Sequence, residues 1–160
     1  MLEKFFFDWS AILAFTRGEV HGPAVIELID RIKRAQRITS VLVACECYRG
    51  IPLSSAKRKS QMRVLNALLE FFALNPVYEA QAMAGARLFR YSAGAIAPIL
   101  AAQCIDGNYT MVTIDTRHFI NVPAIKIATQ QAAPGCDQRV MGLRDFCVTL
   151  RGAYRHRGTI

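Results

Sequence analysis

Three carboxylates occupy unusual places in this sequence, because each one interrupts or directly follows an apolar run. Glu46 is the only charged residue of the segment SVLVACEC, Asp8 directly follows three phenylalanines, and Asp115 directly follows MVTI. A carboxylate in apolar surroundings is costly to desolvate unless something pairs with it. The three acids together therefore predict one shared site, and their oxygen atoms are ligands that suit Mg²⁺ or Mn²⁺.

Each acid also has an ordinary structural role open to it. Asp8 can cap the helix that follows it, and Asp115 can be a turn residue. Glu46 can pair with Arg49, three residues further along a helix. The sequence leaves both kinds of role open for each residue taken alone, whereas the three together favour a shared site.

The elements that must position these acids alternate between strands and helices. Strands are expected at residues 4–7, 38–39, 73–77, 110–114 and 125–127, and helices at 10–16, 23–32, 40–50, 54–72, 79–90 and 98–105. This alternation predicts an α/β fold with a mostly parallel central sheet. In such a sheet ligands bind beyond the carboxyl ends of the strands. Asp8 and Asp115 stand at two such ends, and Glu46 is expected to reach the same region from a neighbouring helix.

The composition is that of a globular protein with an anionic partner. Of 160 residues 52% are hydrophobic and 20% charged, and the net charge of +8 favours nucleic acid as the partner. The five cysteines are odd in number and form no C-x-x-C pair, which argues against a disulfide scaffold or a zinc site. Reduced cysteines and the lack of a convincing targeting or membrane-spanning segment predict a cytoplasmic protein without a membrane partner.

Four blocks of sequence resemble the successive motifs of the PIN domain family, most closely those of VapC-like toxins of toxin–antitoxin pairs. They are residues 6–13 (FFDWSAIL), 38–50 (ITSVLVACECYRG), 99–102 (ILAA) and 111–119 (MVTIDTRHF). The resemblance implies a flavodoxin-like α/β/α sandwich, PIN-like over residues 1–130. A basic C-terminal extension, residues 131–160, is expected to follow it.

The resemblance also implies a metal-dependent ribonuclease. Asp8, Glu46 and Asp115 are then the catalytic acids, and they bind Mg²⁺ or Mn²⁺, which lowers the pKa of a bound water and stabilises charge on the phosphate. Family members of this kind act on RNA, and many form homodimers and are inhibited by a small antitoxin protein. Those partners are expected here by resemblance alone.

Three further residues belong to the expected site. Ser10 and Thr113 match positions that support the acids, and capping or strand-end hydrogen bonding is an equally open role for both. Arg117 follows the third acid and is expected to contact substrate phosphate.

One acid of the family pattern is missing. The block ILAA is normally preceded by a metal-binding Asp, and Ala97 stands at that position. Pro98 suits the first position of a helix, so Ala97 is expected to be the N-cap, where Ala costs about 0.5–2 kcal/mol relative to Asp or Ser. We therefore expect impaired catalysis.

The alternative is a catalytically inactive PIN-fold module that binds RNA or protein. A haloacid-dehalogenase-like phosphatase fits less well, since Ser10 stands where its second Asp is expected.

Overall fold

The computed structural model describes residues 3–17, 22–54, 56–92 and 94–128, except for the side chains of residues 15–17 and 22–24. The expected basic extension, residues 131–160, lies outside the described residues. Five short strands form one parallel sheet in the order β3-β2-β1-β4-β5. Their bounds are β1 Phe5–Phe7, β2 Arg37–Ser40, β3 Ala73–Asn75, β4 Thr110–Val112 and β5 Lys126–Ala128. The predicted parallel α/β fold is confirmed.

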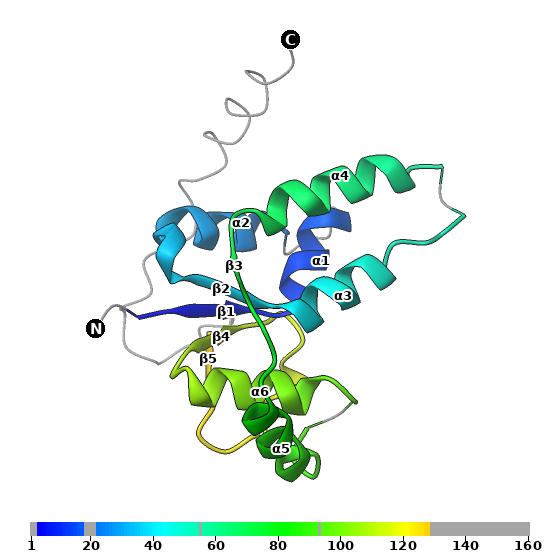
Figure 1. The fold of residues 1–160 in the computed structure, drawn as a ribbon. Coiled ribbons are helices and arrows are strands. Elements are labelled where there is room, and N and C mark those ends of the chain that lie inside the picture. Colours follow the sequence, from blue (N-terminus) through cyan, green and yellow to red (C-terminus); the bar gives the residue numbers. More distant parts are fainter. Residues whose placement is uncertain (1–2, 18–21, 55, 93, 129–160) are drawn as a thin grey trace.

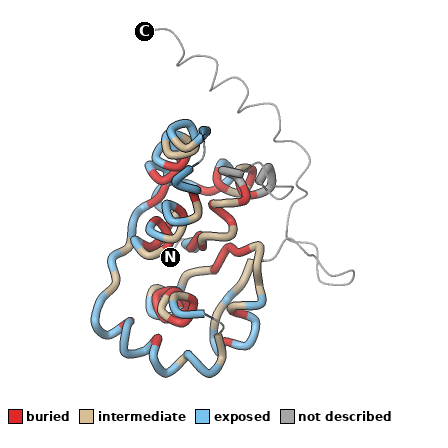
Figure 2. The backbone as a smooth tube through the Cα atoms, turned by 90° about the vertical axis from the view of Figure 1, so that its right-hand side faces the viewer, coloured by how far each residue is buried: buried red, intermediate tan, exposed pale blue. Residues whose placement is uncertain are grey.

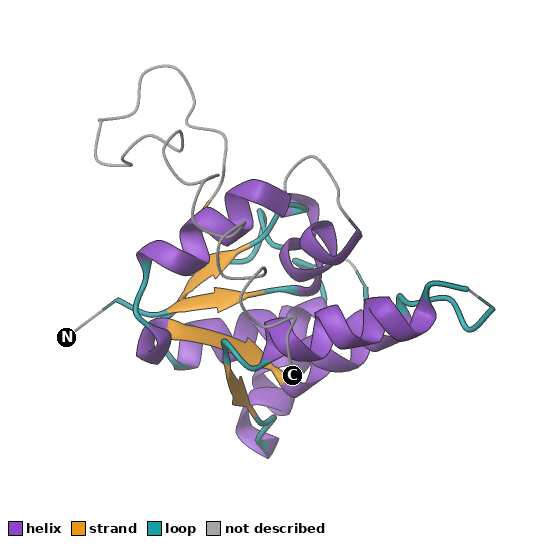
Figure 3. Cartoon of the chain, turned by 90° about the horizontal axis from the view of Figure 1, so that it is seen from above, coloured by secondary structure: helices purple, strands orange, loops and turns teal. Residues whose placement is uncertain are grey.

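Helices cover both faces of this sheet, which makes the fold a three-layer sandwich (Figures 1 and 3). The α-helices are α1 Trp9–Arg17, α2 Gly22–Arg31, α3 Val41–Arg49, α4 Arg58–Leu69, α5 Glu79–Leu88 and α6 Ala97–Asp106. Two short 3₁₀ helices, η1 Arg34–Gln36 and η2 Thr116–His118, complete the set for the described residues. In Figure 1, α1, α2 and α4 lie above the strands, α3 lies to their right, and the α5–α6 pair lies below them.

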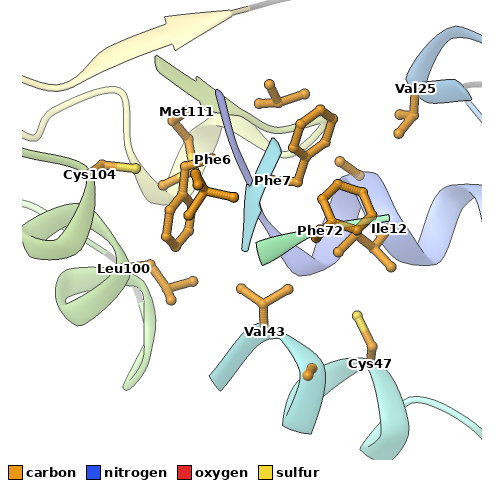
Figure 4. Close-up of a cluster of buried hydrophobic side chains, with 14 of the residues drawn as sticks. Phe6, Phe7, Ile12, Val25, Val43, Cys47, Phe72, Leu100, Cys104 and Met111 are labelled. Atoms are coloured by element: carbon orange, nitrogen blue, oxygen red, sulfur yellow. The ribbon is translucent and has the colours of Figure 1, made fainter. Parts of the chain in front are cut away.

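Strand β1 is the centre of the core, because its side chains alternate between the two faces. Phe6 and Phe7 are both fully buried. Figure 4 shows Phe6 beside Leu100 of α6, while Phe7 lies beside Phe72 and Ile12 on the other face. Buried residues therefore run through the middle of the molecule on both sides of the sheet (Figure 2).

Several helix boundaries differ from the sequence-based expectation, and those of α4 and α6 bear on the core and the site. Helix α4 is shorter than the expected 54–72 and ends at Leu69. The chain leaves the helix there because Phe72 must turn into the core against Phe7, and Ala73 must pair with Ile38 of β2. The expectation that Ala97 is an N-cap is wrong by one residue, since Ile96 is the N-cap of α6 and Ala97 its first residue. Ser40 caps α3 as expected, and its hydroxyl accepts a hydrogen bond from the backbone N–H of Leu42.

The strand order creates a crevice beside the carboxyl end of β1. The chain proceeds from β1 to β2 and β3 on one side, then crosses to β4 on the other side of β1. The chain connections therefore run in opposite directions on the two sides of β1, which makes this place a topological switch point. Ligands bind at switch points of this kind in parallel sheets.

Candidate functional site

A cleft of about 410 Å³ lies at this switch point. It is formed by the start of α1, the second half of α3 and the segment that follows β4. We call it the carboxylate–arginine cleft. Its lining residues are Trp9, Ser10, Leu13, Glu46, Arg49, Gly50, Ile114 and Asp115. Glu46 and Asp115 thus line one cleft although 69 residues separate them in the sequence.

Asp8 does not line this cleft and is fully buried. One of its oxygens, Oδ1, accepts hydrogen bonds from the Ser10 hydroxyl at 2.8 Å and from the backbone N–H of Ala11 at 3.0 Å. The other oxygen accepts a hydrogen bond from the Thr113 hydroxyl at 2.8 Å. Burial raises the pKa of Asp8 to about 6, and these hydrogen bonds offset part of that rise. Asp8 therefore caps α1 and ties β1 to the end of β4.

Ser10 connects buried Asp8 with Asp115 in the cleft. While it donates to Asp8, its oxygen accepts hydrogen bonds from the backbone N–H groups of Ile114 at 3.0 Å and Asp115 at 3.2 Å. The Thr113 hydroxyl lies 3.1 Å from that of Ser10. These contacts hold the loop after β4 in place, and with it the backbone of Asp115.

Both cleft carboxylates carry a guanidinium partner. Arg117 forms a two-pronged pair with Asp115, with Nε 2.8 Å from Oδ1 and Nη2 2.7 Å from Oδ2. The hydrogen bonds from Arg117 lower the pKa of Asp115. Arg49 pairs in the same way with Glu46, with Nε 3.2 Å from Oε1 while Nη2 contacts Oε2. The pairing of Glu46 with Arg49, one of the two roles that the sequence left open, is thus present.

The arrangement does not fit a resident divalent ion. Carboxylate oxygens suit Mg²⁺ or Mn²⁺, but no group of three or more His, Cys, Asp or Glu side chains among the described residues is placed to hold a metal. Glu46 and Asp115 are each bonded to an arginine, and both oxygens of Asp8 accept other hydrogen bonds. Ala97, buried at 1% exposure within the core, offers no ligand.

The PIN domain model matches residues 5–125 of this sequence. The chain belongs to the PIN domain family. Its motif-bearing blocks and the cleft both lie within the matched range. No curated protein matches the chain in sequence.

Solved structures of similar fold support the assignment to the PIN family. VapBC from Salmonella typhimurium, bound to DNA, superposes with a TM-score of 0.65 at 18% identity, covering 80% of this chain and 98% of that chain. VapBC2 from Rickettsia felis, bound to a promoter DNA fragment, has a TM-score of 0.64 at 16% identity and covers 79% and 98%. FitAcB from Neisseria gonorrhoeae has a TM-score of 0.64 at 22% identity and covers 77% and 95%. At these identities the likeness shows a shared PIN fold.

Two cleft residues of this PIN domain were not singled out from the sequence. Arg49 was considered only as a structural partner of Glu46, although its spacing of three residues already placed both on one side of α3. Nothing in the sequence marks Trp9 as a residue of the site except its position directly after Asp8. It lines the cleft and packs against the ring of His118, with centroids 5.5 Å apart.

Proposed function

We propose that this protein is a ribonuclease of the toxin–antitoxin type and that it receives RNA in the carboxylate–arginine cleft. The observation that carries the proposal is the position of Glu46 and Asp115 in one cleft at the carboxyl ends of β1 and β4, within the PIN match. The net charge of +8 is consistent with an RNA substrate.

Its turnover is expected to be weak. Asp8, Glu46 and Asp115 are the acids that the family resemblance assigns to Mg²⁺ or Mn²⁺, yet only Glu46 and Asp115 line the cleft. The position of the missing acid of the family pattern holds Ala97, whose methyl group cannot act as a ligand. A divalent ion must therefore compete with two arginines for two carboxylates, so we expect low metal affinity.

The test is to restore the missing acid with Ala97→Asp and to compare it with the neutral control Ala97→Asn. With Mn²⁺ or Mg²⁺ present, Ala97→Asp should cleave RNA at least about tenfold faster than the wild type, a difference of about 1.4 kcal/mol in the barrier. Because position 97 is buried, both variants are expected to be less stable. Mn²⁺ should raise the melting temperature of Ala97→Asp alone, since a ligand that binds the native state stabilises it.

Asp115→Asn in the Ala97→Asp background supplies the decisive comparison. If that double variant cleaves RNA as fast as Ala97→Asp, the cleft is not the reaction site. Equal metal responses of Ala97→Asp and Ala97→Asn would likewise contradict the proposed ligand position.

A second candidate function is a catalytically inactive PIN module that binds RNA or protein. The observation that favours it is the pairing of both cleft carboxylates with arginines, at Glu46–Arg49 and Asp115–Arg117. It predicts that Ala97→Asp remains inactive with every divalent ion while binding of RNA persists.

A small antitoxin protein and a second copy of this chain are the protein partners proposed from the family resemblance. One of the matched structures is described as a toxin–antitoxin complex from Klebsiella pneumoniae. Light scattering of the purified chain tests the homodimer, and co-purification with the product of an adjacent gene tests the antitoxin.

Among the described residues, every helix is too short or too polar to cross a membrane.

A further inference from the structure

We propose that the cleft binds the phosphodiester backbone of RNA through the guanidinium groups of Arg49 and Arg117, without a divalent cation. This inference rests on the proposed function, because it assumes that RNA enters the carboxylate–arginine cleft. It assigns to two side chains of the protein the charge compensation that the family resemblance assigns to a metal.

The charges at the cleft support this assignment. Glu46 and Asp115 each form an ion pair with one arginine, so the negative charge of each carboxylate is compensated by a positive charge. His118 lies close as well, with Nε2 3.4 Å from Asp115 Oδ2. A cluster of unpaired carboxylates attracts a cation, whereas paired carboxylates attract it far less.

The two arginines are placed on the solvent side of their partners. The side chain of Arg49 is 76% exposed and that of Glu46 17%, while Arg117 is 86% exposed and Asp115 25%. An anion that approaches from solvent therefore meets the guanidinium groups before the carboxylates. Ion pairs this exposed hold their side chains weakly in water, so each arginine can turn from its carboxylate to a phosphate.

The geometry of the pairs suits phosphate. Each guanidinium already presents its Nε and Nη2 N–H groups to the two oxygens of a carboxylate, and the same planar fork matches two oxygens of a phosphate. Arg49 belongs to α3 and Arg117 to η2, so the two forks extend from separate elements. Two contacts from separate elements can hold one strand at two points.

Three other arginines, on α2, η1 and β2, are less available to RNA. Arg31 pairs with Glu27 in α2. Arg34 donates to the carbonyl oxygen of Glu70 at 2.9 Å, and Arg37 donates to that of Ile32 at 3.0 and 2.7 Å. Arg34 and Arg37 connect elements of the fold, and the side chain of Arg31 is 33% exposed against 76% for Arg49 and 86% for Arg117. These three arginines are therefore weaker candidates for RNA contacts than the cleft pair.

The experiment uses the fluorescence of Trp9, the only tryptophan in the chain, which lines the cleft. The full-length protein is titrated with a single-stranded RNA oligonucleotide in EDTA. Wild type should bind, and Arg49→Gln and Arg117→Gln should each weaken binding by about tenfold. Each variant should also reduce the slope of log affinity against log salt by about 0.7. Arg87→Gln, an exposed arginine of α5 that does not line the cleft, is the matched control and should bind like wild type.

Glu46→Gln distinguishes RNA binding by arginines from RNA binding through a metal, because the two modes predict opposite changes in RNA affinity. It releases Arg49 from its carboxylate, so RNA should bind several-fold more tightly in EDTA. If a metal bridged the carboxylates and the phosphate, the same variant would bind RNA more weakly than wild type when Mn²⁺ is present. Calorimetric titration with Mn²⁺ provides a second test. Arg49→Gln and Arg117→Gln should each bind the ion more tightly than wild type, because each variant frees a carboxylate.

The possible failures are distinguishable. RNA binding that requires Mn²⁺ or Mg²⁺, or arginine variants that bind like Arg87→Gln, overturns this inference. The proposed function stands in that case if Ala97→Asp cleaves RNA. No RNA binding in any condition, together with no cleavage by Ala97→Asp, overturns both.

Discussion

At the scale of one residue, Asp8 is a buried carboxylate whose hydrogen bonds hold three parts of the fold together. Its two oxygens accept hydrogen bonds from Ser10, Ala11 and Thr113, which joins β1, α1 and the end of β4. Desolvation nevertheless raises its pKa from 3.8 to about 6. The carboxyl group is therefore more easily protonated in the folded chain than in the unfolded chain, and the stability of the fold must depend on pH.

The sign of this dependence gives a test with Asp8→Asn. Because the folded pKa lies above the unfolded one, the stabilising contribution of Asp8 is fully present below pH 3.8 and is lost as pH rises through about 6. The loss is of the order of 3 kcal/mol at 1.36 kcal/mol per pKa unit. Asn should remove this dependence because its amide does not titrate, and the same amide can still accept from Ala11 and donate to Thr113.

Urea unfolding of wild type and Asp8→Asn at about pH 4 and about pH 8 checks the expectation. The variant should gain stability relative to wild type at the higher pH. An equal pH dependence of the two proteins would show that Asp8 titrates alike in the folded and unfolded states.

At the scale of elements, the contact between α5 and α6 depends on a small residue. Gly85 is buried on α5, and a Cβ atom at this position would lie 3.0 Å from Ile99 Cα and 3.2 Å from Ile99 N on α6. Backbone atoms cannot turn aside as a side chain can. With a Cβ atom at position 85, α6 would have to move away from α5 by a few tenths of an ångström.

Gly85→Ala should consequently destabilise the protein, although alanine favours helices. Overpacking costs about 1–3 kcal/mol, whereas the gain in helix propensity is at most about 1 kcal/mol. We expect a net loss of about 1 kcal/mol in the free energy of unfolding, measured with urea. Ala86→Ser, at an exposed position of the same helix, should change it by less than about 0.5 kcal/mol. A more stable Gly85→Ala would mean that α6 can shift without cost.

At the scale of the whole molecule, β1 couples the two helical layers. Phe6 stacks on Tyr109 with ring centroids 6.2 Å apart, and Phe7 meets Phe72 edge-on at 5.0 Å on the opposite face. Each layer thus packs against the same strand. We infer that neither layer can unfold alone without exposing a phenylalanine of β1.

Phe6→Ala and Phe7→Ala should therefore each lower the free energy of unfolding of the entire domain by about 3–5 kcal/mol. Thermal unfolding followed by circular dichroism should keep a single transition in both variants. Phe71→Ala is the matched control, because Phe71 is 49% exposed, and it should cost far less. A second, separate transition in Phe6→Ala would show that the α5–α6 layer is independent of the rest.

The sequence by itself determined the class of fold and the place of Asp8 at the end of its strand. Alternating apolar strands and amphipathic helices are local patterns, so they predicted the parallel sheet, and the residue types at the element ends predicted the Ser40 cap and Asp8 directly after β1. The expected strand 110–114 ends earlier, at Val112, and Asp115 is the N-cap of η2. Only the tertiary structure decided that Asp8 lies buried behind Ser10, outside the cleft, and that Arg117 covers Asp115. The physical reason is that the desolvation and partners of a charged side chain depend on groups brought together by the strand order, and segments distant in sequence supply most of those groups.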